Sequence, residues 1–171
     1  MLSFIPEIQN DIAPIRALLI AAFGGTGEAD LVEVIRNSPN FIPELSLVGW
    51  EDGEAIAHIL FTSLAIEGRD RAFGALALAP LAVAPQRQRQ GIGSQLVEFG
   101  LSKCRELGHG IVVVVGEPEY YQRFGFQRAS QFGLTSSLEL PDEVFMVMEL
   151  YPSALMDVSG VVRYPAYFDG V

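Results

Sequence analysis

A short turn with two glycines is the part of the chain best suited to bind an anion. It consists of Gln88-Arg89-Gln90-Gly91-Ile92-Gly93. Glycine lets the backbone approach a ligand closely and adopt dihedrals that other residues resist. If a helix begins at this turn, its first N–H groups lack partners within the helix and lie at the positive end of its dipole. Arg87, Arg89 and Ser94 add two charges and a hydroxyl there, so the turn is predicted to bind a phosphate group.

Two well-known phosphate-binding loops can be compared with this turn. A nucleoside triphosphate loop requires Gly-Lys-Ser/Thr, which is absent. A dinucleotide loop requires Gly-x-Gly-x-x-Gly, and Leu96 stands where the third glycine belongs. It also requires an acidic residue at the end of the next strand. Gly116 ends that strand, although Glu117 follows closely enough to keep a dinucleotide open. A helix-start turn without any ligand is the remaining alternative.

Two flanking segments make this turn resemble a known family. Leu81-Ala82-Val83-Ala84-Pro85 precedes it, and Tyr120-Tyr121-Gln122-Arg123-Phe124-Gly125-Phe126 follows downstream. With the turn they resemble the GCN5-related N-acetyltransferases (GNAT), whose acetyl-CoA motif is Gln/Arg-x-x-Gly-x-Gly/Ala after a strand. The resemblance extends over almost the whole chain, and it is to a bacterial subgroup of the YhbS type.

The resemblance implies a cofactor, a reaction and a set of site residues. The cofactor is acetyl-CoA or another short acyl-CoA, and the reaction is direct attack of a primary amine on the thioester in a ternary complex. Tyr121 is implied as the general acid for the departing thiolate. The resemblance also implies two groups of cofactor-binding positions. The backbone of Leu81, Ala82 and Val83 is implied to pair with the pantetheine arm. The pyrophosphate is implied to be bound by the amides of Gln88, Arg89, Gln90, Gly91, Ile92, Gly93 and Ser94. A non-catalytic acyl-CoA-binding module or sensor is the alternative.

Other candidate groups carry less chemistry. Cys104 lies in an apolar helical stripe, which favours packing over a covalent acyl-enzyme role. His58 lies on a strand and is expected to be a satisfied structural histidine, while His109 is expected to be solvated in a turn. Glu117 could relay a proton, but an exposed loop carboxylate explains it as well, so the general base is not assigned. No His, Cys, Asp or Glu grouping has metal-ligand spacing.

The elements that must position the turn follow from periodicity and punctuation. The expected helices begin near Asp11 (as cap), Glu28 and Gly91, and the expected strands lie at 4–8, 45–50, 54–66, 73–83, 111–115 and, as the last one, 145–150. Leu31, Val34 and Ile35 are expected on the buried side of the second helix. Strand, helix and strand around Gly91 form a right-handed βαβ unit. We therefore predict an α/β fold with one mixed central sheet, splayed at the cofactor site and flanked by helices.

Composition limits the class of partner. The chain has 171 residues and a formal net charge of −10, from 21 acidic and 11 basic side chains. Nucleic acid and anionic membrane surfaces both require a basic footprint, so neither is expected. The acidic balance suits an amine substrate, whether a small molecule or a peptide. One cysteine favours a reducing compartment, and no apolar run approaches membrane-spanning length, so a cytoplasmic location is expected.

The domain organisation is expected to be simple. Residues 1–171 are predicted to form a single domain, on which residues 151–171 pack as a C-terminal segment. The aromatic side chains of that segment are Tyr164, Tyr167 and Phe168. They could line the acceptor pocket, seal a homodimer or cap the core, and capping is the expected role.

Overall fold

The computed structural model describes residues 1–169, which divide into two compact units. Unit 1 holds residues 1–62 and 79–103, and unit 2 holds residues 63–78 and those from 104 onward. Three elements, β3, β4 and α3, run from one unit into the other. The helices are α1 (Ile12–Phe23), α2 (Gly27–Arg36), α3 (Ile92–Glu106) and α4 (Pro118–Gln122). The strands are β1 (Ser3–Pro6), β2 (Ser46–Glu51), β3 (Glu54–Glu67), β4 (Ala72–Val83), β5 (Ile111–Val115), β6 (Gln127–Arg128), β7 (Leu134–Ser136), β8 (Phe145–Glu149) and β9 (Gly160–Arg163).

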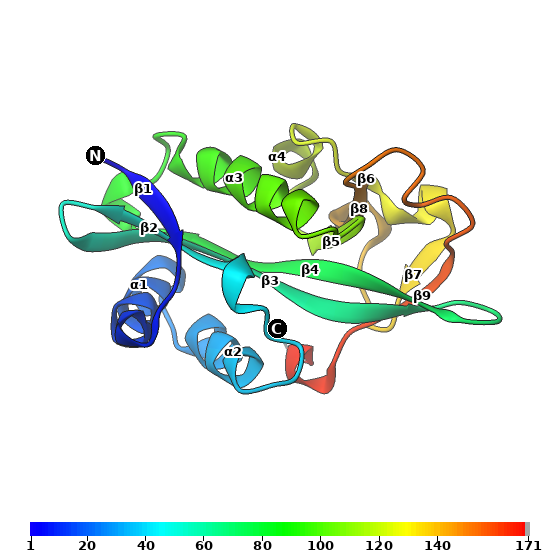
Figure 1. Cartoon of the computed structure of the whole chain (residues 1–171), viewed down its shortest axis with the longest axis horizontal. Coiled ribbons are helices and arrows are strands. Elements are labelled where there is room, and N and C mark those ends of the chain that lie inside the picture. Colours follow the sequence, from blue (N-terminus) through cyan, green and yellow to red (C-terminus); the bar gives the residue numbers. More distant parts are fainter. Residues whose placement is uncertain (170–171) are drawn as a thin grey trace. The chain divides into compact units, whose positions relative to one another are not determined.

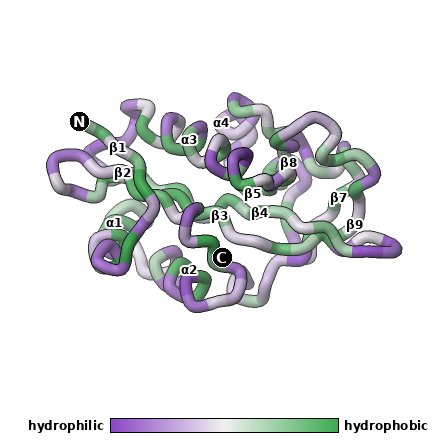
Figure 2. The backbone as a smooth tube through the Cα atoms, in the orientation of Figure 1, coloured by the Kyte–Doolittle hydropathy of each residue, from purple (hydrophilic) through white to green (hydrophobic). Residues whose placement is uncertain are grey.

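Unit 1 is built on three antiparallel strands. β1 pairs with β2, and β2 pairs with β3. The β2–β3 turn places Asp52 at φ 51° and Gly53 at φ 78°, the left-handed pair that a tight two-residue hairpin requires. Within this unit α1 and α2 cover one face of the strands and α3 the other (Figure 1). The strands between these helices are hydrophobic along much of their length (Figure 2), so both faces of the sheet are buried.

The first two helices largely follow the sequence pattern. α1 ends at Gly24, which has φ 76° and donates its N–H to the Ile20 carbonyl. Two expectations were wrong. The Asp11 side chain does not cap α1 but accepts the Ile8 N–H at 2.8 Å. Val34 is 49% exposed, and Val32, at 1%, takes its place in the core.

α3 packs its apolar stripe against β3. Leu96 and Val97 are fully buried, and the backbone at Gly100 approaches the Phe61 ring so closely that an added Cβ would lie 2.5 Å from it. A glycine in mid-helix is unfavourable, so this close approach is the physical reason for it. The stripe ends with the helix, since Leu107 lies beyond α3 and is 46% exposed.

Unit 2 contains the parallel pair that the βαβ pattern predicted. Leu76–Leu78 of β4 pair with Val112–Val114 of β5, while β8 pairs antiparallel with β5 on its other side and β6 with β8. The expectation that β8 is the last strand was wrong. β9 follows it, pairing antiparallel with β3 and parallel with β7. β9 is short and has no alternating pattern, so tertiary pairing and not local sequence defines it.

Aromatic side chains before residue 170 pack against one another and against β8 in unit 2. Phe168 is 4% exposed, and its ring centroid lies 5.3 Å from that of Tyr164. Tyr164 also lies 6.3 Å from Phe145 of β8, and burial raises its pKa above the ordinary value. Within residues 1–169, no helix is long and apolar enough to cross a membrane.

Candidate active site

The glycine turn adopts an irregular backbone that only a few residue types favour. After the 3-10 turn at Pro85–Arg87, Gln88 is extended, Arg89 has φ 63° and Gly91 has φ 82°. A non-glycine residue at positive φ is uncommon and marks a conformation imposed by its surroundings. α3 begins at Ile92, directly after the second left-handed residue. Successive amides around such residues form a concave surface suited to an anion.

The amides of this turn are available to a ligand. Within the described part of the chain, the backbone N–H groups of residues 89–93 donate no turn or cap hydrogen bond to a backbone carbonyl. The next helical bond runs from the Gln95 N–H to the Gly91 carbonyl at 3.1 Å. Gln88 lies beside them, with its side-chain amide donating to the Val83 carbonyl at 3.0 Å. The turn therefore presents a row of unsatisfied donors at the N-terminus of a 15-residue helix.

The two arginines of the turn differ in their surroundings. Arg87 forms an ion pair with Glu51 of the β2–β3 hairpin, and its Nε donates to the Gln90 side-chain oxygen at 3.2 Å. The hydrogen bond with Glu51 raises the pKa of Arg87 and lowers the pKa of Glu51. Arg89 is exposed and forms no ion pair within residues 1–169. Sequence reasoning missed Glu51, because no spacing pattern connects a hairpin tip with a turn 36 residues away.

The predicted pantetheine positions lie on the last part of β4. Leu81 and Val83 are half-buried, and Ala82 is buried between them. The parallel ladder with β5 covers only residues 76–78 of β4, so residues 81–83 lie beyond it. The end of β4 is fixed instead to β3, since Ala84 donates its N–H to the Ile56 carbonyl at 2.8 Å.

Tyr121 lies in α4, the short helix that begins at Pro118. Its ring packs edge-on against Phe126 at 5.8 Å and directly over Gly116. A Cβ on Gly116 would lie 2.5 Å from the ring, so any side chain at this position would require the Tyr121 ring to move. Burial is the main cause that raises the pKa of Tyr121 to about 12, and the adjacent Tyr120 is the second. The phenol is therefore protonated at neutral pH.

Tyr120, which precedes Tyr121 in α4, has different contacts. The Arg123 guanidinium lies 4.6 Å from its ring centroid, and Phe124 packs edge-on at 5.3 Å. The two tyrosine rings stand nearly perpendicular to each other, at 89°. The two rings contact each other edge-on with centroids 5.0 Å apart, and Arg123 lies over only the Tyr120 ring among these two.

A buried polar network surrounds His58 in unit 1. His58 is fully buried, and its Nε2 lies 2.9 Å from the Ser46 hydroxyl, which donates to Glu7. Glu7 in turn accepts two hydrogen bonds from Arg36, at 2.7 and 3.2 Å. Among the described residues His58 Nδ1 has no partner. The consistent tautomer therefore places the proton on Nε2, leaving only an acceptor unpaired. Burial first, and then Arg36, lower the pKa of His58 to about 3.

The remaining candidates fill structural roles or lie on the surface. Cys104 is fully buried, and burial raises its pKa to about 12, which confirms the packing role over a nucleophilic one. His109 is half-buried and not fully solvated, and burial lowers its pKa. Glu117 is exposed, and its carbonyl accepts the Tyr121 N–H at 3.1 Å. Within residues 1–169, no cluster of three His, Cys, Asp or Glu side chains could hold a metal ion.

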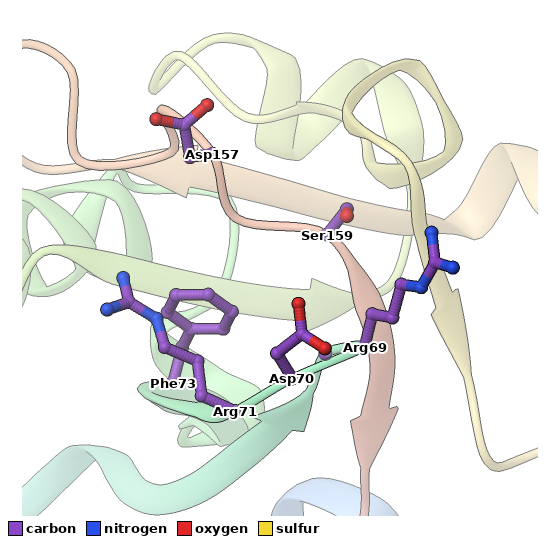
Figure 3. Close-up of a pocket in the computed structure, with 7 residues that line it drawn as sticks. Arg69, Asp70, Arg71, Phe73, Asp157 and Ser159 are labelled. Atoms are coloured by element: carbon purple, nitrogen blue, oxygen red, sulfur yellow. The ribbon is translucent and has the colours of Figure 1, made fainter.

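Two adjoining surface cavities lie in unit 2, where the sequence predicted no site. One of about 250 Å³ lies at the β3–β4 turn, with Arg69, Asp70 and Asp157 around it (Figure 3). The other, of about 430 Å³, is lined in part by Gly110 and Ile111. Those two residues lie at the start of β5, whereas α4 follows its end. Neither cavity is lined by Tyr121 or by the glycine turn, so neither contributes to the predicted site.

Comparison with known families decides what kind of site this is. The family model of the acetyltransferase (GNAT) domain matches residues 8–129. The chain belongs to the GNAT family. Its class is therefore N-acetyltransferase, and both the predicted family and the α/β fold with a parallel β4–β5 pair are confirmed. The glycine turn and Tyr121 both lie within the matched residues.

Two bacterial relatives agree with this assignment along nearly the whole chain. The chain is 35% identical to the N-acetyltransferase YhbS of Escherichia coli K12 over 164 residues, which are 95% of this chain and 96% of YhbS. It is 34% identical to YjhQ of the same strain over 158 residues, covering 91% and 87% of the two chains. Both relatives are N-acetyltransferases without a described substrate.

Solved structures of the family were obtained with the expected cofactor. The crystal structure of Escherichia coli YhbS in complex with CoA matches this fold with a TM-score of 0.90 and 33% identity, covering 98% of this chain and 91% of that one. A GNAT acetyltransferase from Brucella melitensis in complex with acetyl-CoA matches with a TM-score of 0.80 and 31% identity, covering 99% of both.

Proposed function

We propose that this GNAT acetyltransferase transfers an acetyl group from acetyl-CoA to a primary amine of a small molecule or peptide. The observation that carries the proposal is the row of backbone N–H groups at residues 89–93 that donate no turn or cap hydrogen bond to the backbone among the described residues. The left-handed dihedrals of Arg89 and Gly91 shape this row at the start of α3. Such a row, at the positive end of a helix, matches the two negative phosphates of the cofactor. YhbS and the Brucella melitensis relative, which bind CoA and acetyl-CoA, support the choice of ligand.

Under this proposal the cofactor-binding residues divide into two groups. The backbone of Leu81, Ala82 and Val83 pairs with the pantetheine arm, because these residues lie beyond the β4–β5 ladder. The amides of the turn bind the pyrophosphate, with further contacts from the side chains that flank them. The positions concerned are Gln88, Arg89, Gln90, Gly91, Ile92, Gly93 and Ser94. An unpaired N–H near Leu81 would stabilise the oxyanion.

The reaction requires one proton to reach the departing sulfur. The neutral amine attacks the thioester carbon, and the tetrahedral intermediate collapses by breaking the carbon–sulfur bond. We assign the proton on the thiolate to the Tyr121 phenol, while the new amide nitrogen loses its extra proton to solvent. Tyr121 holds its proton at neutral pH, as an acid must, since burial raises its pKa.

The same pKa favours a second candidate function. An acid of pKa about 12 is a weak donor to a thiolate whose conjugate acid is near 8.5. The difference corresponds to roughly 5 kcal/mol before the desolvated thiolate gains basicity. A chain that binds acyl-CoA without turnover, as a module or sensor, fits a phenol of this kind. If the chain does transfer the acetyl group, its negative charge favours a cationic acceptor.

Cofactor binding can be tested by thermal unfolding. Acetyl-CoA at 100 times its dissociation constant should stabilise the fold by about 2.7 kcal/mol, which for a chain of this size raises Tm by roughly 5–10 °C. Gly91→Glu should abolish the shift, because it places a carboxylate and a strained backbone at the phosphate site. An unchanged Tm for the wild type at saturating acetyl-CoA would remove the cofactor from the proposal.

Turnover can be tested by following release of the CoA thiol across a panel of primary amines. We expect release with at least one amine, and a strongly reduced rate with Tyr121→Phe. Binding of acetyl-CoA without release for any amine would favour the sensor instead.

A further inference from the structure

The β2–β3 hairpin contacts the proposed pyrophosphate turn through one ion pair. Glu51, the last residue of β2, accepts from the Arg87 guanidinium, and the two side chains are only 23% and 28% exposed. Arg87 also donates its Nε to Gln90 at 3.2 Å and its backbone N–H to Ala84 at 2.8 Å. The Arg87 guanidinium therefore connects the hairpin with the middle of the turn, while its backbone N–H bonds to the residue after β4.

We infer that Glu51 is a positioning residue for CoA binding, and that it acts by fixing Arg87 so that the turn keeps its open shape before the cofactor arrives. The turn contains two left-handed residues in three, Arg89 and Gly91, and within residues 1–169 the N–H groups of residues 89–93 donate no turn or cap hydrogen bond to another backbone group. A loop of this kind gains affinity when its bound conformation is fixed in advance. This inference rests on the proposed function, since it requires that the turn holds CoA.

The ion pair also divides the roles of the two arginines. Arg87 has its charge matched by Glu51 and its fork occupied by Glu51 and Gln90. Arg89 is exposed and forms no ion pair among the described residues. Arg89 is therefore the cation of the turn that remains available to the phosphates, and Arg87 shapes the turn.

The sign of a charge-removing substitution separates this role from simple electrostatics. Glu51→Gln removes a negative charge near the site of a highly anionic ligand, so charge alone would make CoA bind more tightly. If Glu51 acts by positioning Arg87, the substitution should instead weaken CoA binding. For a partly exposed ion pair we expect the Kd to rise about fivefold. Glu54→Gln is the matched control, because Glu54 faces Glu51 across the same hairpin and forms no ion pair within residues 1–169. It should leave the Kd within twofold or tighten it.

The test is a calorimetric titration of the full chain with CoA. Glu51→Gln and Arg87→Met should each raise the Kd about fivefold, and the double variant should be no weaker than either single one. In turnover assays KM for acetyl-CoA should rise with kcat unchanged, and Glu51→Asp should restore much of the affinity. Arg89→Gln should weaken binding and reduce its salt dependence, which Glu51→Gln should leave unaltered.

Any other outcome of these titrations rejects either the positioning role of Glu51 or the cofactor assignment. If the wild type binds CoA and Glu51→Gln binds equally well or more tightly, the positioning role fails while the cofactor assignment stands. A double variant weakened by the product of the two single effects would show independent residues and would also reject it. If the wild type does not bind CoA, the proposed function and this inference fall together. Near-ultraviolet circular dichroism of each variant confirms that the fold is intact.

Discussion

The contact between Gly116 and Tyr121 gives a direct way to displace the proposed general acid without removing it. A Cβ at position 116 would lie 2.5 Å from Cε2 and 3.1 Å from Cδ2 of Tyr121. Carbon atoms in contact prefer about 3.5–4.0 Å. Gly116→Ala must therefore move the edge of the ring by about 1 Å. The ring cannot swing freely, because Phe126 and Tyr120 pack against it at 5.8 and 5.0 Å.

The expected cost follows from that displacement. A misplacement of about 1 Å at a reacting group reduces a rate by roughly 100-fold, so kcat of Gly116→Ala should fall by about that factor. Tyr121→Phe should lower kcat by 100-fold or more, since it removes the proton donor altogether. The double variant should be no slower than Tyr121→Phe, because both changes act on one group. The Kd for CoA should stay within twofold in all three, because the glycine turn is unchanged.

The assay is steady-state release of the CoA thiol, with a structural control. Gly110→Ala is the matched substitution, since its Cβ would meet Tyr151 at 2.8–2.9 Å in the same unit. Tyr151 has no proposed role, so this variant should keep kcat near that of the wild type, with a stability loss of up to about 1–3 kcal/mol from overpacking. If Gly116→Ala keeps full kcat although its crystal structure shows the ring displaced, Tyr121 is not the acid. A loss as large in Gly110→Ala would show that the effect comes from folding.

Two further predictions concern stability. Gly100→Ala should destabilise the fold by about 1–3 kcal/mol in urea unfolding despite its better helix propensity, because Phe61 leaves no room for a Cβ; the exposed Ser102→Ala should instead be neutral or slightly stabilising. Because burial lowers the pKa of His58 to about 3, the unfolded chain binds the extra proton below about pH 6.5. The contribution of the neutral His58 to the free energy of unfolding should therefore be fully present above pH 6.5. From there towards pH 3 the free energy of unfolding should fall by up to about 1.4 kcal/mol per pH unit. The fall should be smaller in His58→Gln, and an identical pH profile for both would contradict the reasoning.

Most of the fold could be predicted because its signals are local. The Asp52-Gly53 turn, the helix stop at Gly24 and the strand–helix–strand pattern around Gly91 each depend on the backbone preferences of a few adjacent residues. The glycine turn belongs to the same class, since an anion site at a helix N-terminus is built from one continuous segment. The family followed from such segments together, and the match over residues 8–129 agrees with it.

What the sequence could not determine depends on residues far apart in the chain. β9 exists because β3 and β7 pair with it, and nothing in its four residues requires a strand. The burial of His58 with Ser46, Glu7 and Arg36 joins β2, β3, α2 and the loop after β1, so the histidine could not be assigned from its own strand alone. The ion pair of Glu51 with Arg87 likewise spans 36 positions.

The two levels therefore answered different questions about the glycine turn. The sequence by itself predicted an anion site there, because unpaired helix-start amides and glycine dihedrals are local properties. It also suggested that Arg87 and Arg89 contribute charge alike. Tertiary structure decided otherwise, since only the folded hairpin places Glu51 on Arg87 and leaves Arg89 unpaired among the described residues. Ion pairing depends on proximity in space, which no spacing along the chain encodes.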